Sequence, residues 1–407
     1  MAEVADLEIS RIGSQGDGVA ERDGHALYVP FALPGERWRE SEGAFARLTD
    51  APGRQHAICQ HFMRCGGCVA QHMSDDVYAG WKQDIIADAF HHRGIEAEIA
   101  PLVRVKANSR RRAYFGVERN GSKVTIGFRE EGQHKLVNLA ECPVLDPLIV
   151  RALGALKGMA RIAMREREGG RLLVTKLDHG LDVAFENGRK DLGAVDRAEL
   201  AKLAGSARFI RLSVGGETIM ESGRPTLTIG GVEVDPPQGI FLQAVPEAEA
   251  LLIDHVTRSL PKRAKSVADL FCGVGTLTFP MARVASVTAY DNDKRAMVAM
   301  NAAMRRTQGL KPIEARQRDL FRDPLSVREL NGFDAVVFDP PRAGAAEQAE
   351  RLAQSKVPVI IAVSCSPATL ARDARTLIDG GYNMGVVTPI DQFIYSPHLE
   401  AVAVFRR

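Results

Sequence analysis

The sequence predicts an α/β protein whose C-terminal part is a Rossmann-like, doubly wound parallel sheet. Three observations support this fold class. From about residue 236, apolar runs typical of buried strands alternate with helical segments, as in parallel sheets; the runs span 267–271, 287–290, 335–338 and 359–363. The length of 407 residues suits roughly two to four domains. Hydrophobic residues make up 45% and charged residues 26% of the chain, as in soluble globular proteins.

The sequence before residue 236 predicts two further domains. Residues 1–52 contain short strand-like runs separated by turn signals such as Asp23-Gly24, so we expect a small β-domain there. Residues 53–235 indicate an α+β domain, with helices from Ser74 to Gly94 and near 146–160, and strands that include 113–117 and 171–175. The predicted domains are therefore 1–52, 53–235 and 236–407.

Charge and composition exclude several function classes. Lys and Arg total 53 against 51 Asp and Glu, so the formal charge of +2 gives no global signal for nucleic acid, and any basic surface must be local. The acidic N-terminal sequence has no apolar signal region, and no long apolar run follows, so we expect a cytoplasmic protein without membrane spans. In that reducing compartment cysteines are expected to be ligands, catalysts or packing residues rather than disulfides.

Two glycines follow the first strand of the predicted C-terminal sheet. Gly273 and Gly275 lie between strand 267–271 and a helical run, where a backbone without side chains lets a ligand approach closely. The next strand ends at Asp291, whose carboxylate can accept the hydroxyls of a ribose. The third glycine of the dinucleotide fingerprint is absent. This absence counts against a nicotinamide cofactor and is compatible with S-adenosylmethionine.

The third strand of this sheet, 333–338, ends in Asp339-Pro340-Pro341-Arg342. The two prolines end the strand rigidly and fix the carboxylate beyond the sheet edge. Enzymes that methylate amino groups carry a similar acidic-Pro-Pro sequence followed by an aromatic residue. Because Arg342 takes the place of that aromatic residue, methylation of carbon is favoured over methylation of an exocyclic nitrogen.

A cysteine and a glutamate are candidate catalytic residues. Cys365 follows the apolar strand 359–363 and precedes a helix, whose partial positive charge favours the thiolate. The C5 atom of uracil or cytosine becomes a carbon nucleophile only after a group adds to C6, and a thiolate can make that addition. The C5 proton must then leave, and Glu400, at the start of the last strand, is the candidate base.

At these motifs the sequence resembles the family of S-adenosylmethionine-dependent RNA uracil-5-methyltransferases. The matching motifs occur in family order and are Gly239-Ile240-Phe241-Leu242-Gln243, Asp269-Leu270-Phe271-Cys272-Gly273-Val274-Gly275, Asp339-Pro340-Pro341-Arg342-Ala343-Gly344, Ser364-Cys365-Ser366-Pro367-Ala368-Thr369-Leu370-Ala371-Arg372-Asp373 and His398-Leu399-Glu400. The resemblance implies a methyltransferase sheet in residues 236–407.

The resemblance also implies roles for individual residues. Cys365 would be the nucleophile and Glu400 the base that takes the C5 proton. The residues expected to bind the cofactor S-adenosylmethionine are Gln243, Phe271, Gly273, Gly275, Thr276, Asp291, Asp319 and Asp339. The family usually has asparagine at positions 276, 366 and 245, where this chain has Thr, Ser and Val. These departures remove amides but no group that the expected steps require.

Four further cysteines suggest a metal site. Cys59, Cys65 and Cys68 lie in one loop and Cys142 lies farther along the chain. Four thiolates suit either a zinc ion or an iron–sulfur cluster. Three clustered cysteines with one distant cysteine suit a cubane better than the paired spacing of zinc ribbons, and members of the resembled family carry a [4Fe–4S] cluster at this spacing. We therefore expect a [4Fe–4S] cluster, with zinc as the alternative, and a packing role for Cys272.

A basic segment is the candidate RNA-binding surface. Residues 101–135 contain nine Lys or Arg against three Glu, a local net charge of +6. Arg110, Arg111, Arg112 and Tyr114 combine phosphate-pairing groups with a stacking surface, and strand alternation places Arg111 on the face opposite its two neighbours. The resembled family uses the corresponding strand beside its substrate. Residues 1–52 resemble the TRAM module, an OB-like RNA-binding barrel.

These observations lead to one function and two alternatives. We expect a monomeric enzyme that methylates C5 of a specific uridine in 23S ribosomal RNA, since a TRAM module with a four-cysteine cluster is typical of the ribosomal branch of the resembled family. A transfer-RNA uridine methyltransferase is the first alternative. The second is a non-catalytic RNA-binding assembly factor, which should have lost the nucleophile or the base. Both Cys365 and Glu400 are present, which favours the enzyme.

Overall fold

The N-terminal part of the chain forms two small antiparallel sheets. The computed structural model describes residues 6–41 and 43–407. One sheet has the order β1 (Asp6–Glu8), β5 (Arg37–Ser41), β6 (Ala44–Arg47), and the other has the order β2 (Arg11–Ile12), β3 (Gly18–Arg22), β4 (His25–Val29). Asp23 and Gly24 join β3 to β4 with positive φ angles of 52° and 75°, as a tight hairpin requires. Strands therefore occupy the region predicted as a small β-domain, and both its status as a separate domain and its assignment as a TRAM barrel stay predictions.

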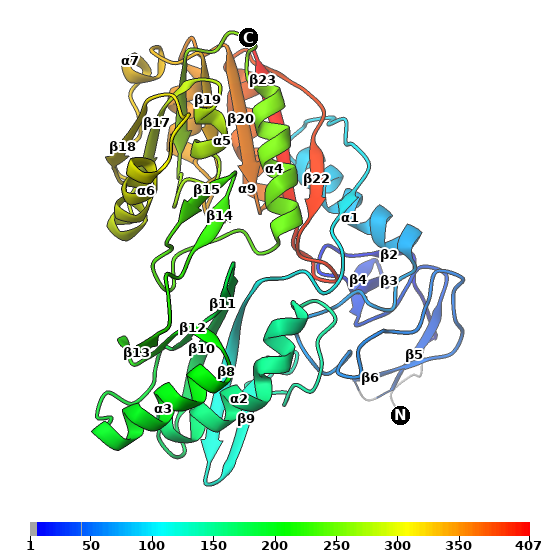
Figure 1. Ribbon diagram of the computed structural model, residues 1–407. Helices are drawn as coiled ribbons and strands as arrows, with labels where there is room; N and C mark the ends of the chain where they lie inside the picture. Colours follow the sequence, from blue (N-terminus) through cyan, green and yellow to red (C-terminus); the bar gives the residue numbers. More distant parts are fainter. Residues whose placement is uncertain (1–5, 42) are drawn as a thin grey trace.

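The central part of the chain forms a second, mixed sheet with helices packed against it. The strand order is β13 (Glu217–Glu221), β12 (Phe209–Val214), β11 (Gly180–Phe185), β10 (Gly169–Leu177), β8 (Arg112–Asn120), β9 (Lys123–Gly127). Helices α2 (Pro147–Ala163) and α3 (Ala194–Ser206) pack on this sheet in the lower lobe of Figure 1. The α+β pattern expected for this region is therefore observed.

The C-terminal part forms the predicted sheet. Its order is β18 (Ile313–Gln317), β17 (Ser286–Asp291), β16 (Ser266–Leu270), β19 (Ala335–Phe338), β20 (Val359–Ser364), β23 (Glu400–Arg406), β22 (Thr388–Asp391), β7 (Val103–Arg104), with β21 (Asn383–Met384) also paired to β23. The run from β18 to β20 is parallel, whereas β23 is antiparallel to β20. A hairpin of β14 (Leu227–Ile229) and β15 (Val232–Val234) precedes it.

Helices cover both faces of this sheet, as a doubly wound fold requires. Helices α4 (Pro246–Ser259), α5 (Thr278–Ala282) and α6 (Lys294–Arg306) share one core with alternate strand residues such as Val337. Helices α1 (Asp75–His91), α7 (Val327–Leu330), α8 (Ala346–Ala353) and α9 (Pro367–Asp379) share the other core, to which Val336 belongs. The strand order reverses between β16 and β19, and ligands of such sheets bind at this point, beyond the carboxyl ends of the strands.

Helix α1 and strand β7 belong to the C-terminal sheet although they lie early in the chain. Strand β7 pairs in parallel with β22, and Ile86 and Phe90 of α1 lie in the same core as β20 and β23 (Figure 1). The three-domain division stays a prediction, to which the structure adds that residues 75–104 pack against the sheet predicted for residues 236–407. Among the described residues no helix is long and apolar enough to cross a membrane.

Candidate active site

A cavity of about 540 Å³ opens at the carboxyl ends of β16, β17, β19 and β20. We call it the strand-end cavity. Six of the predicted site residues line it: Phe271, Gly273, Asp291, Asp339, Cys365 and Glu400. Parallel strands end at the same edge of a sheet, so their short connections bring together residues that are far apart in sequence. The strand-end cavity is therefore the candidate active site.

The glycine turn after β16 is held by the end of β17. The backbone amide of Gly273 donates to Asp291 Oδ2 at 2.9 Å, and that of Asp293 donates to Asp291 Oδ1 at 2.8 Å. Gly275 has φ +99°, and a Cβ there would lie 2.6 Å from the Phe279 ring. The helix expected behind the turn is α5, which spans only five residues from Thr278. A fixed carboxylate, rather than a long helix dipole, is thus the main polar feature of this wall.

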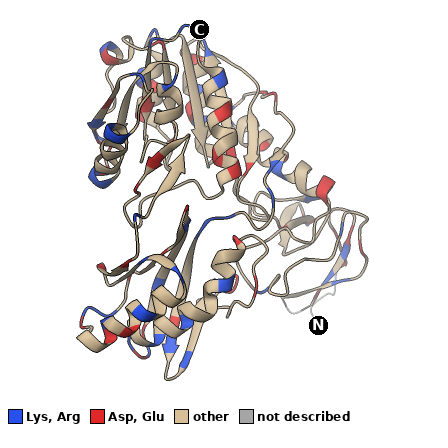
Figure 2. Cartoon of the chain, in the orientation of Figure 1, with Lys and Arg blue, Asp and Glu red and all other residues tan. Residues whose placement is uncertain are grey.

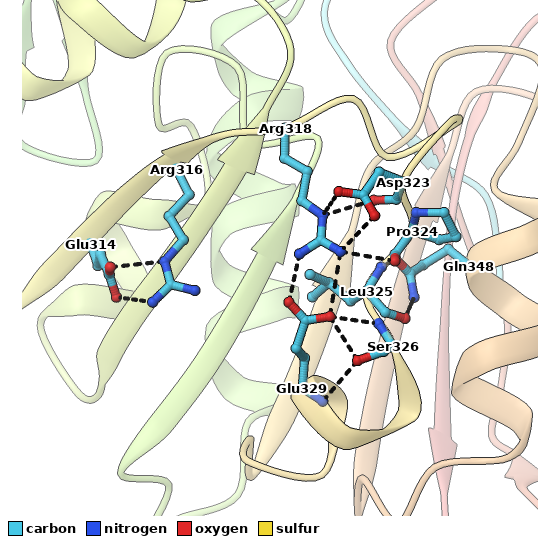
Figure 3. Close-up of polar contacts among 9 residues, drawn as sticks. All are labelled: Glu314, Arg316, Arg318, Asp323, Pro324, Leu325, Ser326, Glu329 and Gln348. Carbon is cyan, nitrogen blue, oxygen red and sulfur yellow. Dashed lines mark hydrogen bonds and ion pairs between the residues drawn. The ribbon is translucent and has the colours of Figure 1, made fainter.

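The opposite wall is a loop closed by a network of ion pairs (Figure 3). Arg318 donates to Glu329 Oε1 at 2.6 Å and pairs with Asp323 at 2.9 Å, and these contacts hold residues 318–329 in a compact turn. The Arg318 guanidinium lowers the pKa of Glu329 to about 2. The turn presents Phe321, whose ring packs against that of Phe271 with the two centroids 5.3 Å apart, and both residues line the cavity. Two aromatic rings therefore face the space beside Asp291.

Four predicted cofactor residues lie outside the lining of the strand-end cavity: Gln243, whose hydrogen bonds are described below, Gly275, Thr276 and Asp319. Asp319 accepts from the Phe321 amide at 3.1 Å, and its side chain is 39% exposed. Gly275 is buried and Thr276 is half-buried behind the glycine turn. These residues support the walls, and their predicted contact with the cofactor stays a prediction.

Cys365 and Glu400 come from adjacent strands of the sheet. Cys365 follows β20 and precedes α9, and Glu400 is the first residue of β23, the antiparallel neighbour of β20. Glu400 is 2% exposed and lies on an interior strand, because β23 is flanked by β20 and β22. Both side chains line the strand-end cavity, so one bound ring can contact both.

The resting charge of Cys365 differs from the expected thiolate. Burial, with the nearby Glu400 and Asp339 carboxyls, raises the pKa of the thiol to about 11, and only Arg342 among the neighbouring side chains opposes this shift. The favourable helix terminus is outweighed by burial among acidic groups. The ligand-free protein therefore holds a neutral thiol, which must be deprotonated before it can act as a nucleophile.

Two buried carboxyl groups, Asp339 and Glu400, line the strand-end cavity, and a third, Asp269, is buried in β16 near Asp339 and Asp291. Burial raises the pKa of Asp269 and of Asp339 to about 7 each. Burial and the nearby Asp339 raise that of Glu400 to about 8, while the Gln392 amide and Arg342 lower it. Asp269 accepts from Thr278 Oγ1 at 2.5 Å, and its Oδ1 has no hydrogen-bond partner among the described residues. A cationic ligand would favour the ionised form of these groups.

Two buried glutamines connect the carboxylates. Gln243 is 2% exposed, lies behind the cavity lining, and donates to Asp339 Oδ2 at 3.1 Å. Gln392 donates to Gln243 Oε1 at 2.8 Å and to Glu400 Oε1 at 2.7 Å. Sequence reasoning missed Gln392, which follows β22 without any motif signal. Only the pairing of β22 with β23 brings it beside Glu400.

The four predicted metal ligands line a second cavity. Cys59, Cys65, Cys68 and Cys142 surround a space of about 300 Å³, which we call the cysteine cavity. Within residues 6–41 and 43–407 no three His, Cys, Asp or Glu side chains are grouped closely enough to hold a metal ion. Burial raises the pKa of all four thiols, that of Cys68 to about 12. The described thiols therefore line one cavity without forming a compact metal-binding group, and the predicted metal site stays a prediction.

The side chains of the arginine-rich segment 110–112 lie in three different environments. Arg111 is 3% exposed, and its guanidinium donates to Glu249 Oε2 at 2.6 Å and to the Gln243 carbonyl at 2.9 Å. The expectation that Arg111 contacts RNA is therefore wrong, because this buried ion pair joins β8 to the start of α4. Arg110 lines the cysteine cavity. Arg112 is partly exposed beside the Tyr114 ring, at 5.3 Å. Figure 2 shows many Lys and Arg in the lobe that contains β8 and β9.

The chain is similar to RNA methyltransferases over nearly its whole length. Residues 173–407 match the family described as tRNA (Uracil-5-)-methyltransferase. An uncharacterised RNA methyltransferase of Brucella suis is 43% identical over 406 residues, which cover 98% of this chain and 97% of that protein. A 23S rRNA (uracil(1939)-C(5))-methyltransferase of Alkalilimnicola ehrlichii is 32% identical over 435 residues, covering 99% of this chain and 96% of that protein.

A solved structure shares the fold. The crystal structure of Pyrococcus abyssi tRNA (uracil-54, C5)-methyltransferase in complex with S-adenosyl-L-homocysteine matches with a TM-score of 0.76 and 22% identity. The match covers 98% of this chain and 100% of that one. At this identity the likeness is evidence for the fold alone.

Proposed function

Because the chain belongs to the family of S-adenosylmethionine-dependent RNA uracil-5-methyltransferases, we propose that it methylates C5 of one uridine in 23S ribosomal RNA, with Cys365 as nucleophile and Glu400 as base. The observation that carries the residue assignment is the placement of Cys365 and Glu400 in the same strand-end cavity, on adjacent strands. No other cysteine among the described residues lines that cavity.

The proposed reaction uses both residues in sequence. The thiol of Cys365 gives its proton to water, its sulfur bonds to C6 of the uracil ring, and the C5–C6 electron pair moves onto C5 and O4. C5 then bonds to the methyl carbon of S-adenosylmethionine, whose bond to sulfur breaks. Glu400 takes the proton from C5, the electron pair re-forms the C5–C6 double bond, and the sulfur of Cys365 leaves C6.

The strand-end cavity suits S-adenosylmethionine. This cofactor supplies an electrophilic methyl group on a positively charged sulfur, and it also carries an ammonium group. Asp291 offers a carboxylate fixed by two backbone amides, and the rings of Phe271 and Phe321 face the space beside it. Asp339 offers a buried carboxyl to positive charge. We assign the ribose to Asp291 and the charged part of the cofactor to the Asp339 side of the cavity.

The assignment to ribosomal RNA rests on the relative at 32% identity and on the layout of the chain. That relative acts, by its name, on 23S rRNA. A small N-terminal β-domain and four cysteines around one cavity accompany the methyltransferase sheet here, as the resemblance to the ribosomal branch requires. Transfer RNA is the second candidate substrate, since the chain shares its fold with an enzyme named for uracil 54 of tRNA.

The support for an iron–sulfur cluster over zinc is the spacing of the cysteines and the resemblance, since four thiolates suit either group. The structure adds that all four thiols line one cavity of about 300 Å³. Among the described residues they do not form a compact group that could hold a metal ion, and this applies to both metals. We propose that Cys59, Cys65, Cys68 and Cys142 hold a [4Fe–4S] cluster with a structural role, because no proposed reaction step transfers an electron.

The surface beside Tyr114 is the proposed path of the RNA. Tyr114 is 38% exposed, and Arg112 and Arg171 lie over its ring at 5.3 and 4.5 Å. Stacking rings flanked by guanidinium groups suit single-stranded nucleotides, and a uridine in structured RNA must leave its helix to reach Cys365. We place the active protein in the cytoplasm as a monomer.

Nucleoside mapping tests the function directly. Ribosomal and transfer RNA from a deletion strain should be compared with wild-type RNA by mass spectrometry of nuclease fragments. We expect one 23S rRNA fragment to lose a 5-methyluridine and to regain it when the wild-type gene is restored. Loss from transfer RNA instead would assign the second candidate, and unchanged methylation of both RNAs would refute the proposed activity.

A further inference from the structure

The geometry points to Gln392 as a positioning residue that holds Glu400 by one carboxylate oxygen and leaves the other oxygen free for the C5 proton. This inference deepens the proposed function and rests on it. The inference rests on two observations. Gln392, which no motif identifies, donates a hydrogen bond to Glu400 Oε1, and the buried Glu400 Oε2 has no hydrogen-bond partner among the described residues.

The orientation of the Gln392 amide is fixed by three partners. The backbone amide of Ala244 donates to Gln392 Oε1 at 3.2 Å, so the nitrogen of the side chain must point the other way. That nitrogen donates to Gln243 Oε1 at 2.8 Å and to Glu400 Oε1 at 2.7 Å. Both hydrogens of the amide are thus used, and a flipped amide would place two donors against the Ala244 amide.

The second oxygen of Glu400 is left without a partner. Glu400 Oε2 is buried and has no hydrogen bond within residues 6–41 and 43–407. Such an unpaired buried oxygen is costly, and a catalytic role is one of the reasons why one persists in a folded protein. Gln392 fixes Oε1 in the sheet, and Glu400 lines the strand-end cavity with Cys365. Oε2 is therefore the oxygen available to a bound ring.

Gln392 is itself held by a buried clamp at the end of β22. Lys82 donates to Asp391 Oδ1 at 2.8 Å and to the His398 carbonyl at 2.5 Å, and Tyr78 donates to Asp391 Oδ2 at 2.6 Å. The Tyr395 amide donates to the Tyr78 hydroxyl at 2.9 Å. Helix α1 thereby fixes both ends of the loop between Asp391 and Glu400. Gln392, the first residue of that loop, has little freedom to move.

The arrangement acts on one step of the reaction. After methyl transfer, C5 carries a methyl group and a hydrogen. Oε2 of Glu400 takes that proton, the electron pair of the C5–H bond re-forms the C5–C6 double bond, and the C6–S bond breaks to return the thiolate of Cys365. Loss of the Gln392 amide should leave the earlier bonds able to form and should slow this last step, so that RNA stays covalently bound to the enzyme.

The experiment follows the covalent adduct in single turnovers. Enzyme, a fragment of 23S rRNA and S-adenosylmethionine with a labelled methyl group are mixed, and the labelled adduct is separated on denaturing gels. We expect Gln392→Leu to slow decay of the adduct by about tenfold or more, and the near-isosteric Gln392→Met to do the same. Gln354→Leu, at an exposed site, is the matched control and should decay at the wild-type rate.

The pH profile of adduct decay distinguishes a positioning role of Gln392 from a purely structural role. Burial and the nearby Asp339 raise the pKa of Glu400, whereas the Gln392 amide and Arg342 lower it. Removing the amide should therefore move the profile of adduct decay to higher pH, whereas a general loss of packing would lower the rate without moving the profile. Decay at the wild-type rate, or an unmoved profile in both variants, would overturn the inference.

Glu400→Gln distinguishes failure of the inference from failure of the proposed function. If Glu400 is the base, this variant should accumulate labelled adduct. Accumulation in Glu400→Gln with normal decay in both Gln392 variants would reject the role of Gln392 alone. Rapid decay in Glu400→Gln would reject Glu400 as the base, and the inference would fall with it.

Discussion

The strand-end cavity and the cysteine cavity share two lining residues, Arg342 and Phe393, yet different interactions fix the other residues that line each cavity. The first is built from strand ends, and its polar groups bond to one another, as Glu400, Gln392, Gln243 and Asp339 do in a chain. The second is built from loops, and its four thiols surround an open space.

This difference indicates which of the two sites is fully formed by the folding of the chain alone. Strand ends are fixed by the backbone hydrogen bonds of the sheet, so the strand-end cavity takes its shape from the fold. Loop thiols gain their arrangement largely from the ion or cluster that they bind. The strand-end cavity should therefore tolerate loss of the group bound in the cysteine cavity, and a Cys68 variant tests this order of dependence directly. The other variants test the strand-end cavity and the RNA surface separately.

The largest effect is expected at the nucleophile. Cys365→Ala should lower turnover by about 10⁴-fold or more and abolish the covalent RNA adduct, because no other described thiol lines the strand-end cavity. Cys272→Ala is the matched control, since that thiol packs against Met297 at 3.9 Å, and it should keep the adduct. Methylation by the Cys365 variant at the wild-type rate would refute the mechanism.

The next effect is expected at the cysteine cavity. Cys68→Ala should lose bound iron and lower the melting temperature by more than about 5 °C, since the cluster would tie the loop of Cys59, Cys65 and Cys68 to Cys142. Iron content, visible absorption and thermal unfolding measure this. Binding of S-adenosylmethionine should change less than threefold. A colourless wild-type protein with one zinc per chain would instead favour the alternative metal.

The pH dependence of cofactor binding should show whether the sulfonium charge lies beside Asp339 and Glu400. At pH 6 Asp339 and Glu400, with pKa values of about 7 and 8, hold protons in the free protein. Positive charge favours their ionised form, so binding should release protons and tighten as pH rises towards 8. Calorimetry in two buffers of different ionisation enthalpy measures the release. S-adenosylhomocysteine, which lacks the sulfonium charge, should release fewer protons, and equal release would contradict this placement.

The smallest effect is expected on the RNA surface. Arg112→Ala should weaken binding of an RNA fragment several-fold and reduce the salt dependence by about one phosphate contact. Tyr114→Ala should weaken binding by about 1–3 kcal/mol through lost stacking. Fluorescence titrations at several salt concentrations test both. Arg258→Ala, an exposed pair partner of Asp254, is the control, and an equal loss there would remove the assignment to Arg112.

Sequence reasoning located the strand ends because they depend on local patterns. The apolar strands before Asp291, Asp339 and Cys365 set where each chain segment ends, and parallel pairing then brings those ends together. Glu400 was located by its motif, and its position on an interior strand became clear only from the pairing of β23. Arg110 and Arg111 lie before the first residue of β8, so the alternation predicted for the three arginines along one strand stays a prediction.

The features that sequence reasoning missed depend on distant contacts. Arg111 is buried because Glu249, 138 positions away, pairs with it, and Gln392 meets Gln243 across 149 positions. No local periodicity encodes such partners. The neutral thiol of Cys365 was missed for the same reason, since its pKa follows from burial beside Glu400 and Asp339 and not from its own helix alone.

The clamp between helix α1 and the last strands also limits when the enzyme can become active. Lys82 and Asp391 are 309 positions apart, and β7 finds its partner only in β22. At about 5–20 residues per second, a ribosome needs roughly 15–60 s to synthesise the intervening chain. During that time the strands against which α1 packs, and the loop that carries Gln392, have not been synthesised. A nascent chain therefore lacks both Gln392 and the proposed base, Glu400, until the last strands of the sheet have been synthesised.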